Sequence, residues 1–353
     1  VQTIGQGAFL GCDRLSAINL PESVASIGDE AFKWCSNLRT ASIQGSVTEL
    51  SRDLFAGCSS LQDVRLPQTV TVLHDGAFQW CSTLKRIKVP DRTTSIGSCV
   101  FYGCRSLNDI EFPTGLRDVG RAAFSGCLAL KNVRFNNGFM AVGEYAFYEC
   151  ASLSDIFFPA SLTQIRDSAF ARCSGLTSMI LPPNLSIMEK CAFRECVGLR
   201  SVTLPVALTE ISDSAFEHCV SLSSINLPDS ITVIGTSAFA GCVELQNVTF
   251  GRSLIKIGWG AFCDCQSLYK LEFPALVKHI DDRAFERCIR LTEVHFAGNA
   301  PSAGSDIYSG TSETLTSYAF LGTQGWEMNL HEEWKERPLR FQVPNRRTDQ
   351  SRR

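Results

Sequence analysis

The sequence has 353 residues, a formal net charge of −3 and a hydrophobic share of 44%. This hydrophobic share is that of a folded protein, and the slightly acidic balance argues against nucleic acid as a partner, because such binding usually requires a basic excess. No apolar run of about eighteen residues occurs, so the sequence predicts no direct membrane insertion.

One motif, Phe-x-x-Cys, recurs with a constant step of 23 residues. Its thirteen copies start at Phe9, Phe32, Phe55, Phe78, Phe101, Phe124, Phe147, Phe170, Phe193, Phe216, Phe239, Phe262 and Phe285. No copy contains an insertion or deletion, which indicates stacked coils that fix one another's length. The repeats predict a solenoid of thirteen units over residues 1–300. The first unit is truncated, which suggests a fragment or a processed form.

Each unit contains three segments, which the unit from Leu15 to Cys35 illustrates. Residues 15–20 end in an alternation of inward and outward side chains, typical of a short strand, and Pro21 terminates it. Residues 24–28 are rich in β-branched side chains and predict a second extended segment on the opposite side of the coil, with Gly28 permitting the turn. The Ala-Phe-x-x-Cys segment predicts one helical or 3₁₀ turn that directs Phe32 and Cys35 inward.

The fold class expected from these segments is a mainly β solenoid. It has a parallel sheet on one face, with short extended segments and 3₁₀ or helical turns on the other. The predicted internal ladder includes Phe32, Cys35, Phe78, Cys81, Phe124, Cys127, Phe170, Cys173, Phe216 and Cys219.

The sixteen cysteines favour neither a disulfide framework nor a metal site. Thirteen occupy one phase of the repeat, where parallel side chains give poor bridge geometry, so we expect reduced thiols that pack as small buried groups. Cys263 and Cys265 have one residue between them, whereas zinc-binding pairs usually follow Cys-x-x-Cys with two. Cys99 and Cys191 share a second phase, four repeats apart. We expect no metal and no cofactor.

Packing determines the inward strand positions, so the residues available to recognise a partner occupy the outward ones. One outward column carries Arg65, Lys88, Arg134, Phe157 and Ile180. The positions beside it add Lys85 and Arg86 to a basic patch that runs into the apolar pair Phe157 and Ile180. Two adjacent apolar side chains bordered by charge resemble a protein-binding patch, although isolated exposed hydrophobic residues are common on ordinary surfaces.

The repeat residues resemble the BspA-like leucine-rich-repeat family, whose unit reads Leu-x-x-Ile-x-Leu-Pro-x-x-Leu-x-x-Ile-Gly-x-x-Ala-Phe-x-x-Cys. Residues 298–301 and 322–326 are similar to the ending of bacterial members, so residues 301–343 are expected to form a C-terminal cap. The basic tail, residues 344–353, lacks an apolar cluster and is expected to be disordered. The resemblance implies an extracellular or cell-surface location and attachment to other cells or host components.

No catalytic motif stands out: the sequence has no Gly-x-Ser-x-Gly elbow, no His-Glu-x-x-His and no phosphate-binding glycine loop. The leading hypothesis is therefore a non-catalytic binding or adhesion module for a protein or glycan partner. The alternatives are a structural spacer that self-associates and an accessory domain of a larger enzyme.

Overall fold

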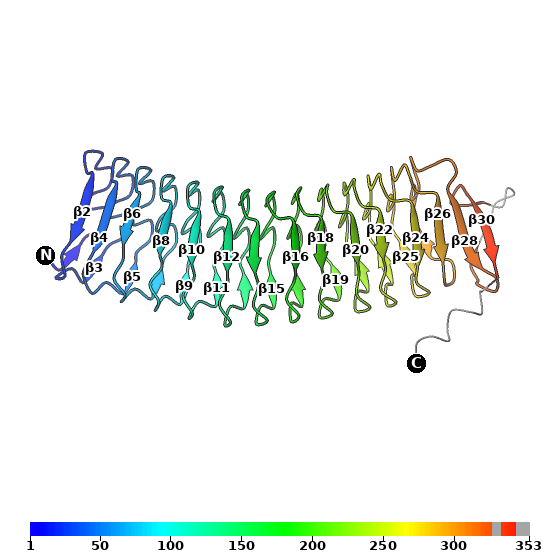
Figure 1. Cartoon of the computed structure of the whole chain (residues 1–353), viewed down its shortest axis with the longest axis horizontal. Helices are drawn as coiled ribbons and strands as arrows, with labels where there is room; N and C mark the ends of the chain where they lie inside the picture. Colours follow the sequence, from blue (N-terminus) through cyan, green and yellow to red (C-terminus); the bar gives the residue numbers. More distant parts are fainter. Residues whose placement is uncertain (327–332, 344–353) are drawn as a thin grey trace. The chain divides into compact units, whose positions relative to one another are not determined.

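The computed structural model describes residues 1–326 and 333–343. The chain divides into two compact units, residues 1–199 and residues 200–353. Within each unit successive coils lie side by side, and each repeat contributes one strand to a front series and one to a back series (Figure 1).

In the first unit the front strands are β2 (Ala17–Leu20), β4 (Thr40–Ile43), β6 (Asp63–Arg65), β8 (Arg86–Lys88), β10 (Asp109–Glu111), β12 (Asn132–Arg134), β14 (Asp155–Phe157) and β16 (Ser178–Ile180). The back strands are β1 (Thr3–Ile4), β3 (Ser26–Ile27), β5 (Glu49–Leu50), β7 (Val72–Leu73), β9 (Ser95–Ile96), β11 (Asp118–Val119), β13 (Ala141–Val142), β15 (Gln164–Ile165) and β17 (Ile187–Met188).

In the second unit the front strands are β18 (Ser201–Thr203), β20 (Ser224–Asn226), β22 (Asn247–Thr249), β24 (Lys270–Phe273), β26 (Glu293–Phe296), β28 (Thr316–Phe320), β29 (Glu333–Trp334) and β30 (Arg337–Gln342). The back strands are β19 (Glu210–Ile211), β21 (Val233–Ile234), β23 (Lys256–Ile257), β25 (His279–Ile280) and β27 (Ser302–Ala303).

Apart from β29, the strands of each series pair in parallel with a register shift of one repeat. In the front series Arg134 lies opposite Phe157, and in the back series Val142 lies opposite Ile165. The back strands β5 to β17 form one seven-stranded sheet, and β19 to β27 form a five-stranded sheet. The predicted parallel β-solenoid is confirmed.

The Ala-Phe-x-x-Cys segment folds differently from a helix. Among the described residues none is assigned to an α- or 3₁₀-helix. Alternate residues of this segment donate backbone N–H groups to the next coil: Glu30 to Arg52, Phe32 to Leu54 and Trp34 to Ala56. Glu30 and Trp34 adopt left-handed φ angles of 59° and 62°. The backbone thus zigzags and forms a third ladder between coils.

Gly28 is required for space rather than for an unusual φ angle. A Cβ atom at this position would lie 2.5 Å from the backbone nitrogen of Gln6 in the preceding coil. The tight approach of two backbones therefore explains the glycine, whereas the sequence suggested that it permitted a turn.

Phenylalanine rings form the spine of the interior. Phe170, which is fully buried, stacks on Phe147 at 5.3 Å and on Phe193 at 5.5 Å between ring centroids. Phe9 in the first coil stacks on Phe32 but is 40% exposed. The structure places all ten ladder residues named from the sequence in the interior.

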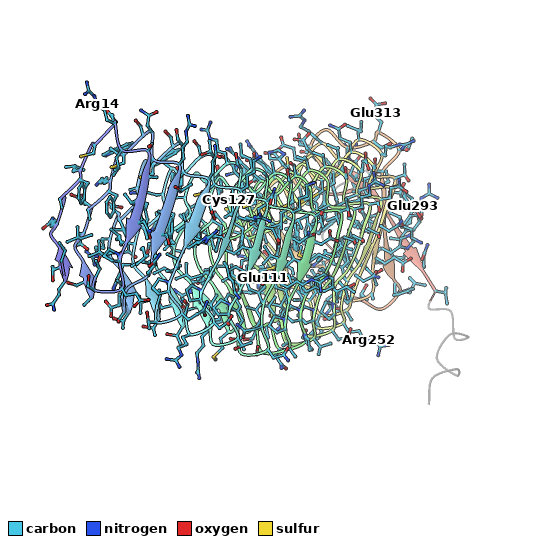
Figure 2. All side chains as sticks on the ribbon, turned by 60° about the vertical axis from the view of Figure 1, so that its left-hand side comes forward. Arg14, Glu111, Cys127, Arg252, Glu293 and Glu313 are labelled. Carbon is cyan, nitrogen blue, oxygen red and sulfur yellow. The ribbon has the colours of Figure 1, made fainter. Side chains whose placement is uncertain are left out.

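The cysteine thiols line the same interior, where Figure 2 labels Cys127. Eleven ladder thiols between Cys35 and Cys288 each donate to the carbonyl of a phenylalanine in the preceding coil, with S···O distances between 3.0 Å at Cys35 and 3.3 Å at Cys265. Burial raises the pKa of Cys58 to about 12, so this thiol stays protonated at neutral pH. Cys12, in the first coil that the structure describes, differs from the other ladder cysteines because it is exposed.

The segment expected to cap the array continues the strand pairing. β28 pairs in parallel with β26, β30 pairs in parallel with β28, and β29 turns back antiparallel to β30. Trp334 is buried and contacts Phe296 at 5.3 Å between ring centroids. The predicted disordered tail, residues 344–353, lies outside the described residues.

Candidate binding surface

The front strands of the first unit present two outward side chains each. In strands such as β8, β10 and β12 the middle residue is buried while the first and third are exposed. This alternation follows from the period of a β-strand. The third positions form one outward column and the first positions form a second column beside it, and Figure 2 labels Glu111 in the first of these columns.

The structure joins two of the residues predicted to contact a partner. The Arg134 guanidinium carbon lies 4.6 Å from the centroid of the Phe157 ring, a cation–π contact between paired strands. Phe157 is 54% exposed, and Ile180, at the same position of the next coil, is 77% exposed. Arg134 therefore orients the Phe157 ring and leaves much of it accessible.

A hollow lies beside this contact. Its volume is about 620 Å³, and its outward lining consists of Glu111, Arg134, Phe157, Asp109, Asn132 and Asp155. Carboxylates, an amide, a guanidinium and an aromatic ring thus converge on a concave part of the front face. This combination suits polar recognition around an apolar contact.

The other predicted residues, Arg65, Lys85, Arg86 and Lys88, are all exposed. The column beside Arg65 and Lys88 carries acidic residues that the sequence interpretation did not weigh. The carboxylate of Asp63 lies 3.9 Å from the guanidinium of Arg65. Asp109 and Asp155 occupy the same column, two residues before Glu111 and Phe157 in their strands. The front face therefore has mixed charge rather than a purely basic patch. Counting two residues back along the strand from each residue of the first outward column would have revealed these acidic side chains in the sequence.

Comparison with known families identifies the architecture. A family model described as a BspA type leucine rich repeat region matches residues 1–108, 94–222 and 209–324. The chain belongs to the BspA-type leucine-rich-repeat family.

Solved structures of similar bacterial proteins share the fold. A leucine-rich repeat protein from Bacteroides ovatus matches with a TM-score of 0.81 and 29% identity, over 91% of this chain and 83% of that one. A leucine rich cell surface protein from Faecalibacterium prausnitzii matches with a TM-score of 0.52 and 28% identity, over 76% of this chain and 82% of that one. The search of curated proteins found no relative.

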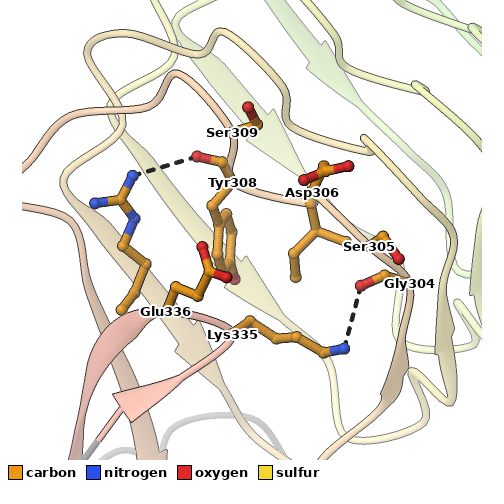
Figure 3. A pocket seen from close by; sticks show the side chains of 9 residues that line it. Gly304, Ser305, Asp306, Tyr308, Ser309, Lys335 and Glu336 are labelled. Carbon is orange, nitrogen blue, oxygen red and sulfur yellow. Dashed lines mark hydrogen bonds between the residues drawn. The ribbon is translucent and has the colours of Figure 1, made fainter. Parts of the chain in front are cut away.

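A hollow of about 330 Å³ also lies in the second unit of this BspA-type chain, beside the capping strands (Figure 3). Its two cations hold the cap in place: Lys335 Nζ donates to the carbonyl of Gly304 at 3.1 Å, and the Arg337 guanidinium donates to the carbonyl of Tyr308 at 3.4 Å. Both cations of the lining are thus used in contacts of the cap, so we assign this hollow to the cap structure.

Within residues 1–326 and 333–343 no group of three or more His, Cys, Asp or Glu side chains could hold a metal ion. The same residues include no helix with the length and apolar character needed to cross a membrane.

Proposed function

We propose that this chain is a non-catalytic binding module whose front face in the first unit recognises a protein partner at the cell surface or outside the cell. The observation that carries the proposal is the pair of exposed apolar side chains Phe157 and Ile180 at the same outward position of consecutive coils. Family membership supports an interaction module in general. The cell-surface location is carried over from the Faecalibacterium protein's description and forms part of the proposal.

The arrangement has the pattern of a small protein interface. Phe157 and Ile180 are held on short strands, and the charged side chains of Arg134, Asp155 and Glu111 lie around or beside them. Protein interfaces commonly combine an apolar centre with a polar rim. Because the strands are fixed by the stack, little conformational entropy is lost when the partner binds.

The expected contribution is large enough to measure. Complete burial of a Phe or Ile side chain is worth roughly 1.5–3 kcal/mol. Since both side chains are already partly covered, we expect each alanine substitution to weaken binding about tenfold.

The experiment measures binding of the intact chain to a panel of purified secreted and cell-surface proteins by biolayer interferometry. Phe157→Ala and Ile180→Ala are compared with Ile187→Ala, a matched control on back strand β17 whose side chain is 44% exposed. We expect the first two variants to lose affinity and the control to keep it, with unchanged thermal unfolding in all three.

Two results would overturn the proposal. One is an interaction that all three variants retain equally, which would place the partner elsewhere. The other is concentration-dependent self-assembly in light scattering that explains all binding, which would favour the structural spacer.

A further inference from the structure

The turn segments of the first unit carry a second hollow, away from the front strands. Its volume is about 490 Å³, and it is lined by Trp34, Ser36, Gly57, Ser59, Trp80, Ser82 and Arg105. Trp34 and Trp80 are 53% and 40% exposed. Two large aromatic side chains thus remain accessible in a stack that buries most of its other rings.

Both tryptophans are held in fixed positions. Their backbone N–H groups donate to the carbonyls of Ala56 and Tyr102 in the next coil, at 2.7 Å each. The Trp80 ring makes an edge contact with Tyr102 at 4.9 Å between centroids. The Trp34 ring covers Gly57, where a Cβ atom would lie 2.2 Å from the ring. Glycine at this position is therefore what lets the ring lie flat over the neighbouring coil.

The two indole rings are separated by one intervening coil. Two parallel-strand steps of about 4.8 Å give roughly 10 Å between equivalent positions. This separation is close to the length of two linked pyranose rings. The C–H faces of pyranose rings are apolar and flat, so they can stack on exposed indole planes.

The serine hydroxyls of this lining already donate their hydrogens within the stack, so toward a ligand they can act mainly as acceptors. Ser36 Oγ donates to Asp13 Oδ1 at 2.8 Å, and Ser82 Oγ donates to the carbonyl of Ser59 at 3.2 Å. Ser59 Oγ likewise donates to the carbonyl of Ser36 at 3.4 Å. Each hydroxyl uses its one hydrogen within the stack and keeps lone pairs for a ligand, and sugar hydroxyls are suitable donors.

Arg105 supplies the one charged group of the lining. It is exposed and makes no ion pair with any residue that the structure describes. A guanidinium group matches a carboxylate in charge and in planar, two-pronged geometry. The lining contains no carboxylate that would repel such a ligand.

We propose that this hollow binds an acidic oligosaccharide, with sugar rings stacked on Trp34 and Trp80 and a sugar carboxylate paired with Arg105. A proline-rich peptide also favours aromatic grooves. Its tertiary amides offer only carbonyl acceptors, however, and the serine hydroxyls here have already donated their hydrogens. The hydrogen-bonding pattern therefore favours the sugar.

The test is isothermal titration of the intact chain with oligogalacturonate, hyaluronan fragments and sialylated oligosaccharides. Cellohexaose serves as the neutral probe, and a proline-rich peptide as the competing class. The principal variant is Trp34→Gly/Trp80→Gly, because Gly57 and Gly103 occupy the same left-handed turn position in other coils. Arg105→Gln tests the charge, and Trp259→Ala, an exposed tryptophan in the second unit, is the control.

We expect at least one acidic oligosaccharide to bind more tightly than cellohexaose. The double tryptophan variant should lose about 10- to 100-fold in affinity, equivalent to about 1.4–2.8 kcal/mol, because both stacking surfaces are removed. Arg105→Gln should remove the preference for the acidic sugar, and Trp259→Ala should change nothing.

The proposal is overturned if no acidic sugar binds at millimolar concentration, if the peptide alone binds, or if the double tryptophan variant binds as the wild type does. It is separate from the proposed protein-binding surface: Phe157→Ala should leave sugar binding unchanged, so either proposal can fail without the other.

Discussion

Phe170→Ala removes a ring of the phenylalanine spine that has stacked rings on both sides, in the first unit. Phe170 is fully buried and has three ring neighbours, Phe147, Phe193 and Phe158, with centroids 5.3, 5.5 and 5.7 Å away. Removal of such a side chain leaves a cavity that the stacked coils cannot close, because hydrogen bonds between the coils fix their spacing. We expect a loss of about 3–5 kcal/mol in the free energy of unfolding.

Phe9→Ala makes the same chemical change at the first coil and serves as the matched comparison. Phe9 is 40% exposed and has Phe32 as its ring neighbour, at 5.1 Å. The lost burial is partial and one aromatic contact disappears, so we expect a loss of about 1–2 kcal/mol.

Urea unfolding followed by circular dichroism measures both changes, and the slope of each transition reports whether the chain still unfolds cooperatively. Phe170→Ala should lower the midpoint more than Phe9→Ala and broaden the transition, because it interrupts contact between neighbouring coils. Equal losses, or a larger loss at Phe9, would refute the view that a central ring depends on neighbours on both sides.

Three further predictions concern the turns, the thiols and the cap. Cys99 has a left-handed φ of 57°, which glycine adopts without strain, so Cys99→Gly should change the free energy of unfolding by no more than about 1 kcal/mol. Val100→Gly at the adjacent buried position should cost about 3 kcal/mol. Similar urea midpoints for the two variants would contradict this assignment. Burial raises the pKa of Cys58 and Cys104 from 9.0 to about 12, so the unfolded chain loses these protons at lower pH than the folded one. The free energy of unfolding should therefore keep its full contribution from these thiols below pH 9 and decline as the pH rises towards 12. An unchanged urea midpoint between about pH 8 and pH 11 would be inconsistent with buried thiols. Trp334→Ala should lower the local stability of the cap by about 3 kcal/mol, because the ring is buried there. Amide hydrogen exchange should then speed up in β28 and β30 but not in the first unit. Exchange that is unaltered in β28 would show that the tryptophan does not close the array.

The sequence predicts the two strand series and the inward side chains because their positions repeat in every unit. Thirteen aligned copies of Phe-x-x-Cys make the period unambiguous, and alternation around Ile18 determines which face is buried. The outward positions of Phe157 and Ile180 follow directly from the same alternation.

The turn conformation could not be predicted from spacing alone. Phe32 and Cys35 are three residues apart, which suits a helical turn, yet the left-handed angles of Glu30 and Trp34 direct alternate N–H groups to the next coil. Glu30 and Trp34 carry no local signal for a left-handed φ, although glycines with left-handed φ angles occupy the same positions in other coils, among them Gly7, Gly57 and Gly103. Hydrogen bonding between coils, a non-local effect, determines the conformation.

The tryptophan hollow escaped sequence analysis for a related reason. Trp34, Gly57, Trp80 and Gly103 occupy one turn position in consecutive units, but their alternation has meaning only once that position is known to lie on the surface. The acceptor character of the serine hydroxyls likewise depends on carbonyl partners one repeat away.

Pulsed alkylation of the native protein, followed by peptide mapping of each thiol, tests the stacked interior most directly. Twelve ladder cysteines are buried, Cys12 is exposed, and Cys99, Cys191 and Cys263 are intermediate. The stacked coils predict rapid modification of Cys12, slower modification of the three intermediate thiols and protection of the ladder until urea unfolds the chain. Modification of central ladder thiols as fast as Cys12 under native conditions would contradict the account.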